Sequence, residues 1–321
     1  MKTIVGVLRG GPSREHKVSL ATGRAILSHL SPERYTLRDI YIDKNGVWYV
    51  AGRPVSHEQA LGTIDAAFPG LHGEYGEDGT VQRILERYGV PFVGANSTAS
   101  AFTAHKVFAK DRAKEYGLKT PRYELIDMRD GEDSKITEII RTFLQPVVVK
   151  PIGWGSSIGV SIVSGYAPLY RAIVDLLVSG APSVLVEEYI SGREATVGVV
   201  DGMRGEKLYT LPPVEIIPPA SEHFFSQNAK YSGDTREICP AQFPRNISEE
   251  LMYAARTIHE ALGIRHYSRS DFIVSPRGVY YLETNTLPGL TPQSLFPKSL
   301  AAVGISMQDF LEHLVANASH G

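Results

Sequence analysis

The chain has 321 residues, of which 43% are apolar and 21% charged, and its 33 basic and 35 acidic residues leave a formal charge of −2. This length exceeds what one hydrophobic core usually supports, so we expect a globular protein of two or three domains. The near-neutral charge, without a long run of one sign, argues against nucleic acid or an anionic membrane as the main partner.

The single cysteine and the absence of long apolar runs argue against a disulfide-bonded, secreted or membrane protein. Cys239 alone excludes an internal disulfide and a cysteine-based metal cage, and packing explains it better than nucleophilic chemistry. The apolar run at the N-terminus is too short for a signal peptide, and no stretch approaches the roughly 20 apolar residues of a membrane span. We therefore expect a cytoplasmic protein without a membrane partner.

Strands and helices alternate over the first hundred residues, which predicts a parallel sheet with helices on its faces. The expected strands are residues 3–8, 35–42, 64–68 and 90–93, and the expected helices are residues 18–30 and 81–88. Ser97 or Thr98 is suited to cap a further helix that runs to about Tyr116 and stops at Gly117.

The regular alternation of strand and helix ends beyond this helix, and domain boundaries are expected near residues 97 and 187. The next strands are expected at 122–126, 146–150, 159–163 and 183–188, with helices near 136–143 and 169–177. The last third holds more strands, a helix at 249–262 and a final helix from about Ser306. The predicted units are 1–97, 98–187 and 188–321.

Two β-rich runs around a Pro/Gly turn predict a hairpin in the last third. A turn centred near Arg277 places Asp271 opposite Glu283 and Arg269 opposite Asn285, all on one face. The opposite face would then carry Phe272, Val274, Leu282 and Thr284. Facing carboxylates repel each other, and oxygens of Asp, Glu and Asn suit a Mg²⁺ that also holds substrate phosphates. We favour a metal site over a solvated strand face.

A second segment has features of a phosphate site. A strand delivers Lys150 to a loop over 153–159 that is rich in glycine and serine. Glycines let the backbone approach a ligand closely, so that amide groups and hydroxyls can surround phosphate oxygens. The spacing is not that of a Walker A motif, and a plain hairpin turn is the alternative.

Three more polar segments follow expected strands. Gly10 and Gly11 lead to a helix N-terminus where Glu15 is either a ligand group or a first-turn charge. The loop over 71–79 lies at the carboxyl end of a strand, where open α/β sheets bind ligands, although a lone histidine such as His72 is more often structural. The acids at 187–188 are suited to hold a nucleotide or to end an exposed strand.

Together these segments resemble the D-alanine–D-alanine ligases of the ATP-grasp superfamily over essentially the whole chain. The motifs that carry the resemblance are Gly10-Gly11-x-Ser13-x-Glu15, His72-Gly73-x-x-Gly76-Glu77-Asp78-Gly79, Lys150-Pro151 before Gly155-Ser156-Ser157-x-Gly159-Val160, Ala229-Lys230-Tyr231, Arg269-x-Asp271-Phe272, and Glu283-x-Asn285-Thr286-x-Pro288-Gly289-x-Thr291-x-x-Ser294-Leu295. The resemblance implies an α/β (α+β) fold with an N-terminal open parallel-sheet domain and two ATP-grasp α+β domains.

The resemblance also implies roles for single residues. The implied ATP-binding set is Lys106, Lys150, Glu187, Ile190 through its backbone, Glu194 and Lys230. The implied metal ligands, for Mg²⁺ or Mn²⁺ and for two ions per site, are Asp271, Glu283 and Asn285.

The implied substrate and catalytic residues surround the two amino acids. Glu15, aided by Ser156, holds the ammonium of the first D-alanine, and His72 lies on the substrate side. The second D-alanine's carboxylate meets Ser294 and Leu295. The implied catalytic groups are the oxyanion-stabilising pair of Arg269 and the Gly289 amide, and Tyr231 on a mobile loop at about 220–236.

The activity implied is ATP-dependent joining of two D-alanines through a D-alanyl phosphate, for peptidoglycan precursors and hence cell-wall biogenesis and cell shape, by a homodimer. A D-alanyl-D-lactate or D-alanyl-D-serine ligase and a catalytically silent nucleotide-binding relative are the alternatives. Lactate-using relatives tend to carry histidine at the position of Tyr231, so this tyrosine favours D-alanine.

The sequence departs from the family pattern at a few positions. Phe225 and Gln227 stand in the mobile loop where the family usually shows tyrosines and an acid. His105 precedes Lys106 in place of an aspartate and is expected to be structural, and Arg83 stands where a glycine often follows Gln82.

Overall fold

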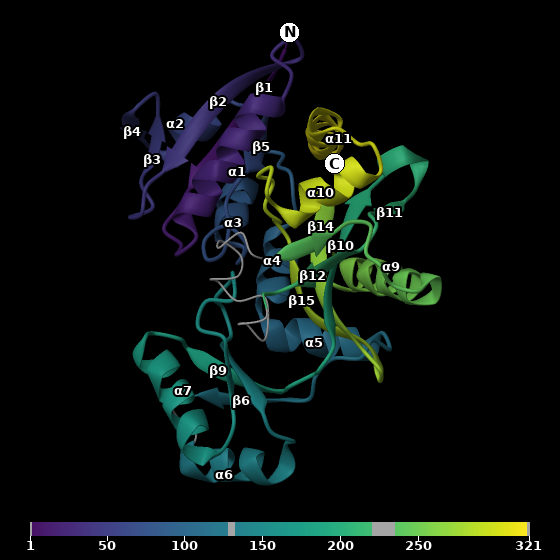
Figure 1. Ribbon diagram of the computed structural model, residues 1–321. Coiled ribbons are helices and arrows are strands. Elements are labelled where there is room, and N and C mark those ends of the chain that lie inside the picture. Colours follow the sequence, from purple (N-terminus) through teal and green to yellow (C-terminus); the bar gives the residue numbers. More distant parts are fainter. Residues whose placement is uncertain (1, 128–131, 220–234, 320–321) are drawn as a thin grey trace.

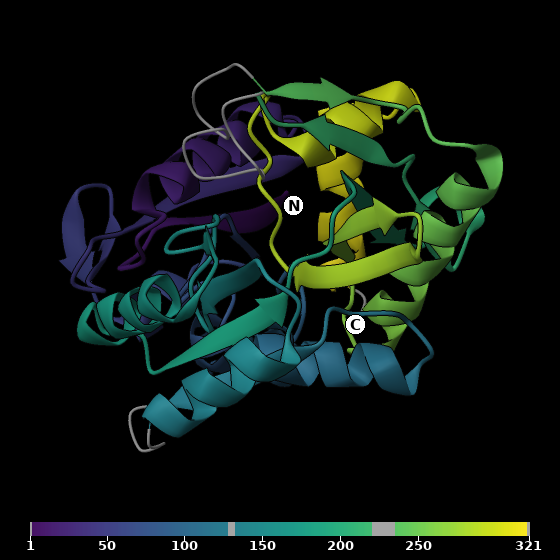
Figure 2. The ribbon, with the colours of Figure 1, turned by 60° about the horizontal axis from the view of Figure 1, so that its bottom comes forward.

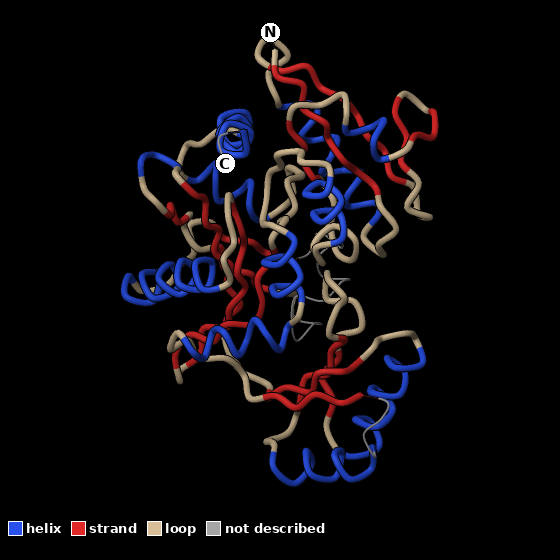
Figure 3. Tube along the Cα trace, turned by 180° about the vertical axis from the view of Figure 1, so that it is seen from behind, coloured by secondary structure: helices blue, strands red, loops and turns tan. Residues whose placement is uncertain are grey.

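The computed structural model describes residues 2–127, 132–219 and 235–319 (Figure 1). These residues form three β-sheets of five, four and six strands, each accompanied by helices. Loops and helix ends gather in the space between the sheets (Figure 3). Within the described residues, no helix is long and apolar enough to cross a membrane.

The N-terminal sheet has the strand order β4-β3-β2-β1-β5. Its strands are β1 (Thr3–Gly10), β2 (Tyr35–Ile42), β3 (Trp48–Val50), β4 (Arg53–Val55) and β5 (Ala66–Pro69). The strand β1 runs parallel to both β2 and β5, as the alternating pattern predicts, whereas β3 and β4 add an antiparallel hairpin that was not predicted. The central strand β1 is buried along most of its length, which is typical of a parallel sheet covered on both faces.

The helices of this sheet are α1 (His16–His29), α2 (His57–Leu61) and α3 (Thr80–Arg87). The expected strand at 90–93 is wrong, because only an isolated bridge forms there, between Ala67 and Phe92. The short helix α2 was not predicted; its N-cap residue Ser56 forms a capping box with Gln59.

Two helices replace the single helix expected over residues 97–116, namely α4 (Ser97–Ala104) and α5 (Lys106–Glu115). The break is at His105, whose extended backbone (φ −82°, ψ 94°) lets its ring nitrogen accept a hydrogen bond from the Phe108 amide at 3.3 Å. The predicted cap is wrong by one residue, since Asn96 rather than Ser97 accepts from the Ala99 amide at 2.8 Å. His105 therefore has the structural role that was expected.

The four-stranded sheet is antiparallel, in the order β6-β9-β7-β8. Its strands are β6 (Tyr123–Asp127), β7 (Val147–Pro151), β8 (Ser161–Val163) and β9 (Ser183–Glu188), and its helices are α6 (Glu132–Thr142) and α7 (Tyr166–Val178). Alternate valines of β7 and β9 pack with Leu169 and Ile173 of α7 in one core. The sheet and its two helices lie below the other two sheets in the views of Figures 1 and 2.

The third sheet is antiparallel in the order β13-β12-β10-β14-β15, with β11 paired to β10. Its strands are β10 (Arg193–Asp201), β11 (Leu208–Thr210), β12 (Val214–Ile217), β13 (Arg236–Ile238), β14 (Tyr267–Ser275) and β15 (Gly278–Asn285). A short 3-10 turn η1 (Met203–Gly205) and the helices α9 (Arg245–Ala261), α10 (Leu295–Ala302) and α11 (Met307–Ser319) complete this part.

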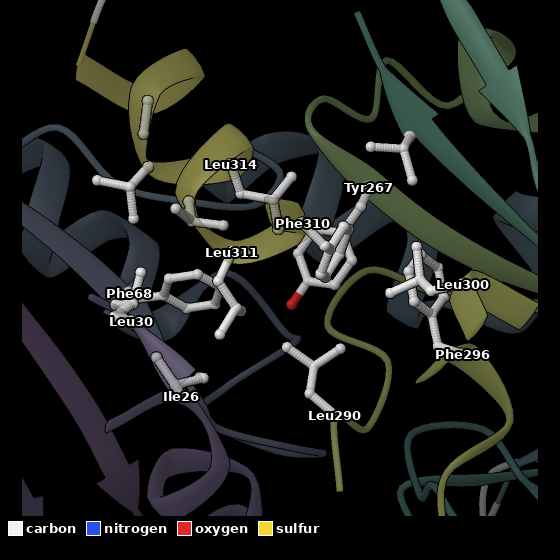
Figure 4. Close-up of a cluster of buried hydrophobic side chains, with 14 of the residues drawn as sticks. Ile26, Leu30, Phe68, Tyr267, Leu290, Phe296, Leu300, Phe310, Leu311 and Leu314 are labelled. Atoms are coloured by element: carbon white, nitrogen blue, oxygen red, sulfur yellow. The ribbon is translucent and has the colours of Figure 1, made fainter. Parts of the chain in front are cut away.

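One hydrophobic cluster joins the two ends of the chain (Figure 4). The final helix α11 packs on α1 and β5, where Phe310 and Leu311 share a core with Ile26 and Phe68. The Tyr267 ring lies edge-on to Phe310 at 5.7 Å between centroids. This core fixes the N-terminal sheet beside the third sheet. The domain boundaries at 97 and 187 stay a prediction; α5, which follows the first boundary, packs on β15 and α9.

Candidate active site

The hairpin β14–β15 pairs Asp271 with Glu283 and Arg269 with Asn285, which confirms these two predicted pairs. The turn itself pairs Ser275 with Gly278, so it is centred one half-residue earlier than expected, and a β-bulge beside Asp271 restores the polar pairing.

The bulge also corrects the predicted faces of β15. It inserts Leu282 as an extra residue on this strand, so Leu282 lines the same pocket as Glu283 instead of joining Phe272 in the core. Tyr281 occupies the core position beside Phe272, with 6.0 Å between the ring centroids. A bulge of one residue leaves no mark in the alternation of residue types, so the sequence could not predict it.

Asp271 is the centre of the polar end of the hairpin. The guanidinium of Arg269 donates to both Asp271 oxygens at 2.9 Å, and the Thr196 hydroxyl donates to Oδ1 at 2.6 Å. The amide of Asn285 lies 3.4 Å from Oδ2. Burial opposes the charge of Arg269, but the carboxylates of Asp271, Glu283 and Glu77 together outweigh burial and raise the pKa of the guanidinium.

These residues fit a hard divalent cation. Asp271, Glu283 and Asn285 supply two carboxylates and an amide oxygen side by side. Among the residues that the structure describes, no group of three or more His, Cys, Asp and Glu side chains forms an all-protein cage. Mg²⁺ is commonly held by one or two carboxylates together with water and substrate phosphates, and the donor atoms of this hairpin fit that coordination.

Lys106 reaches the same place from the start of α5. Its ammonium lies 3.5 Å from a Glu283 oxygen and donates to the Trp154 carbonyl at 3.0 Å. Lys106 therefore contacts both the hairpin β14–β15 and the glycine loop after β7, and it lines the pocket between them.

A buried charge cluster lies at the other end of the pocket. Glu187 at the end of β9 pairs with Lys150 at 2.8 Å and with Lys110 at 2.9 Å. Burial opposes ionisation of Glu187, yet the two ammonium groups lower the pKa of its carboxyl. Burial lowers the pKa of Lys110 to about 8, and its ammonium also donates to the Thr120 hydroxyl at 3.1 Å.

Lys110 was not predicted as a site residue. It follows Lys106 by one helical turn on α5, so both side chains leave the same face of that helix. This spacing was the available signal, although lysines on a helix usually face solvent.

The main pocket lies between the four-stranded sheet and the third sheet. Its apolar walls include Val148, Ile162 and Ile216, and its rim is charged, which is typical of small-molecule sites. The predicted site residues that line it are Lys106, Lys150, Glu187, Ile190, Glu194, Arg269, Asp271, Glu283 and Leu295. Nine residues separated by up to 189 positions are thus brought together.

Glu15 and Ser156 also meet, and Glu15 lines a smaller pocket beside the first. The Ser156 hydroxyl donates to the Glu15 carboxylate. A methyl group added at Gly73 or Gly155 would stand 2.6 or 2.5 Å from the other Glu15 oxygen, so a side chain at either position would displace this carboxylate. Ser156 and Ser157 both adopt positive φ angles, 53° and 57°, which shows that the loop is held in an uncommon conformation.

His72 is buried and uses both ring nitrogens within the protein. Nδ1 lies 2.9 Å from the Leu287 carbonyl and Nε2 lies 2.7 Å from the Thr22 hydroxyl. Burial lowers the pKa of the imidazole, which favours the neutral ring. A hydrogen bond from this ring to a substrate would require one of these two bonds to break.

Gly289 and Ser294 lie together ahead of α10. A methyl group at Gly289 would stand 2.9 Å from the Ser294 hydroxyl, which itself bonds to Thr291 at 2.8 Å. Leu295 begins α10, where it packs with Val214. Lys230, Tyr231 and the unusual loop residues Phe225 and Gln227 lie outside the described residues.

Comparisons with known families match nearly the whole chain. Residues 4–95 match the family model described as the D-ala D-ala ligase N-terminus, and residues 113–316 match the one described as the D-ala D-ala ligase C-terminus. A D-alanine–D-alanine ligase from Geobacter sulfurreducens is 38% identical over 98% of this chain and 94% of its own length. A D-alanine–D-alanine ligase from Syntrophotalea carbinolica is 37% identical over 98% of this chain and 96% of its own length.

Solved structures agree with these matches. A D-alanyl-alanine synthetase A from Vibrio cholerae superposes with a TM-score of 0.88 at 28% identity, covering 100% of this chain and 99% of that one. A D-alanine–D-alanine ligase from Bacillus anthracis, solved in complex with ATP, superposes with a TM-score of 0.81 at 30% identity, covering 100% of this chain and 98% of that one. The D-Ala:D-Ser ligase VanG from Enterococcus faecalis gives 0.87 at 28%, covering 99% and 100%.

Proposed function

The chain belongs to the D-alanine–D-alanine ligase family, and we propose that it joins two D-alanines to D-alanyl-D-alanine while converting ATP to ADP and phosphate. The observation that carries the proposal is the convergence of Lys106, Lys150, Asp271 and Glu283 on one pocket, with the Glu15–Ser156 pair beside it. Cations for phosphates and a carboxylate for an ammonium are the groups that this reaction needs.

The first step is phosphoryl transfer to the carboxylate of the first D-alanine. The nucleotide lies in the main pocket, where Glu187, Glu194 and the Ile190 backbone bind its adenosine end. Lys106 and Lys150 neutralise phosphate charge while the amino-acid carboxylate attacks the γ-phosphorus, because such reactions depend on positioning and electrostatic stabilisation. Mg²⁺ or Mn²⁺, as two ions held by Asp271, Glu283 and Asn285, would supply further charge neutralisation at these phosphates.

The second step is acyl transfer. Glu15, oriented by Ser156, holds the ammonium of the first amino acid, while Ser294 and Leu295 hold the carboxylate of the second. The amine of the second D-alanine attacks the carbonyl carbon of the D-alanyl phosphate, and the tetrahedral oxyanion that forms is stabilised by Arg269 and the Gly289 amide. Collapse of this adduct breaks the bond from carbon to the phosphate oxygen, releases phosphate, and leaves the peptide bond once the nitrogen has given up its proton to phosphate or solvent. Loss of one such donor commonly lowers the rate by ~10²–10³.

The acyl phosphate must be protected from water, which would hydrolyse it. We assign this task to the loop at about 220–236, which carries Lys230 of the proposed ATP-binding set and Tyr231 of the proposed catalytic set. The family's role further supports a cytoplasmic homodimer that supplies peptidoglycan precursors, and thus serves cell-wall biogenesis and cell shape.

D-Serine as the second substrate is the alternative that a specific observation favours, because the D-Ala:D-Ser ligase VanG superposes on this chain with a TM-score of 0.87. Phosphate release from ATP should therefore be measured with D-alanine, L-alanine, D-serine and D-lactate as second substrates, and each product identified by mass. We expect D-alanyl-D-alanine to dominate at neutral pH. A larger response to D-serine or D-lactate would overturn the substrate assignment, and no phosphate release with any of them would overturn the activity.

A further inference from the structure

Two side chains of the loop over residues 72–79 hold the backbone amide and the backbone carbonyl of one residue in a distant segment. His72 Nδ1 lies 2.9 Å from the carbonyl oxygen of Leu287, and the amide of Leu287 donates to Glu77 at 3.2 Å. Leu287 is itself buried. The loop after β5 therefore satisfies both backbone polar groups of a residue more than 200 positions away.

Each of the two side chains is held in turn. A carbonyl oxygen can only accept, so Nδ1 of the neutral His72 ring carries the proton and Nε2 accepts from the Thr22 hydroxyl at 2.7 Å. The second Glu77 oxygen accepts from the Gly73 amide at 2.8 Å. An ionised carboxylate accepts at both oxygens, so Glu77 can serve both amides at once.

Leu287 lies between two residues of the proposed active site. Leu287 follows Asn285 by two residues and precedes Gly289 by two. The ladder of the β14–β15 hairpin ends at the pair Arg269–Asn285, so the segment beyond it takes its position from side-chain contacts such as these. The groups that we assign to the metal and to the oxyanion thus lie two residues before and two residues after Leu287.

We infer that His72, Glu77 and Thr22 are positioning residues that fix the backbone of Leu287, and through it the Asn285 side chain and the Gly289 amide. This inference rests on the proposed ligation. It gives His72 an indirect role in place of direct contact with substrate. The set acts on the rate of the bound complex, because a displacement of about 1 Å at a reacting group can cost ~10²-fold.

Thr22 offers the cleanest test, because it is buried behind His72 and lines none of the three pockets around the site. Thr22→Val keeps the shape and removes the hydroxyl that fixes the imidazole. We expect kcat for dipeptide formation to fall roughly ten-fold, with the KM values for ATP and D-alanine within about two-fold of the parent. Thr22→Ser keeps a hydroxyl and should restore most of kcat.

The matched control is Thr63→Val, which removes a hydroxyl bonded to the Ala60 carbonyl at 3.0 Å in the same part of the fold. It should keep the parent kcat. Equal losses in both valine variants, or a Thr22→Val effect confined to KM, would overturn the inference.

A second measurement does not depend on turnover. Nitrogen-15 spectra of the histidine-labelled full chain should show His72 as the Nδ1–H tautomer, and Thr22→Val should perturb that signal alone among the buried histidines. An Nε2–H tautomer in the parent chain would overturn the grip even if ligation is normal. Conversely, the Nδ1–H form in a chain that releases no phosphate would support the contacts of His72 with Leu287 and reject the proposed function.

Discussion

The guanidinium carbon of Arg14 lies 3.7 Å from the centre of the Trp154 ring. Arg14 precedes Glu15 on the loop after β1, and Trp154 precedes Gly155 on the glycine loop after β7. The same guanidinium donates to the Ser179 carbonyl at 3.3 Å. The stack thus joins the N-terminal sheet to the four-stranded sheet directly beside the Glu15–Ser156 contact.

Removing the ring should loosen the site for the first amino acid. A cation–π contact contributes about 0.5–2 kcal/mol, so Trp154→Ala should raise the KM for D-alanine several-fold, whereas Trp154→Phe should retain part of the effect. Steady-state kinetics at saturating ATP measures this. Tyr170→Ala, which removes an exposed ring of the same sheet's helix α7, is the control and should change nothing. An unchanged KM in Trp154→Ala would show that the stack does not support the site.

The metal assignment predicts a loss of turnover with the fold intact. Asp271→Asn and Glu283→Gln each remove a carboxylate that would hold the metal ion, and without that ion the ATP phosphates would lose their main counter-charge. Both variants should lack activity while their thermal unfolding stays cooperative. In the parent chain, a chelator should abolish activity and added Mg²⁺ should restore it. Glu260→Gln, which breaks only an exposed pair with Lys207, should behave like the parent. Near-normal activity in both hairpin variants would refute the assignment.

The buried cluster of Lys110, Glu187 and Lys150 predicts a large loss of stability. Lys110→Met leaves the Glu187 carboxylate with one counter-charge instead of two. Removing one partner from a buried ion pair typically costs about 3–5 kcal/mol. Denaturant unfolding should show a loss of that order for Lys110→Met. Lys114→Met, on the same helix but in an exposed pair with Asp111, should stay within about 1 kcal/mol of the parent. Equal stability of the two variants would contradict the role given to Lys110.

Contacts along one strand or helix were readable from the sequence, and contacts between distant segments were not. The pairing of Asp271 with Glu283 follows from the alternation of residues around one turn. The bulge that moves Leu282 into the pocket is a local irregularity of the β14–β15 ladder, and the burial of Lys110 against Glu187 brings the helix α5 to the end of the strand β9. Residue spacing within one sequence carries no information about either. The meeting of Glu15 in the N-terminal unit with Ser156 in the central unit was expected only from the family resemblance.

Glu77 predicts opposite effects of pH on stability and on rate. Burial and the neighbouring Glu15 charge raise the pKa of Glu77 from its usual 4.5 to about 7. The folded chain thus binds more protons than the unfolded chain between these values, and the free energy of unfolding falls as pH rises from 4.5 to 7. The proposed grip on Leu287 needs the ionised form, so kcat should rise through pH 7.

Glu77→Gln should remove both pH dependences, because the amide does not titrate. The measurements are denaturant unfolding and kcat between pH 5 and 9, a window chosen to span the raised pKa by about two units each way. The charged and titratable groups that face Glu77 are Glu15, Glu74, Asp78, Lys106, Tyr267, Arg269 and Glu283. A kcat profile that stays the same in the variant would assign the titration to one of these groups instead.

The glycine loop offers a steric test within a few residues. A methyl group at Gly155 would stand 2.5 Å from a Glu15 oxygen, whereas one at Gly153 would meet nothing within 4 Å. Neither position has a positive φ, so Gly155→Ala and Gly153→Ala differ in space rather than in backbone strain. Gly155→Ala must displace the Glu15 carboxylate or the loop, and the KM for D-alanine should rise by about ten-fold or more, since a lost charge-assisted hydrogen bond costs about 1.5–3 kcal/mol. Gly153→Ala should keep the parent KM, and a similar rise in both variants would mean that loop flexibility, rather than room for Glu15, sets the requirement for glycine.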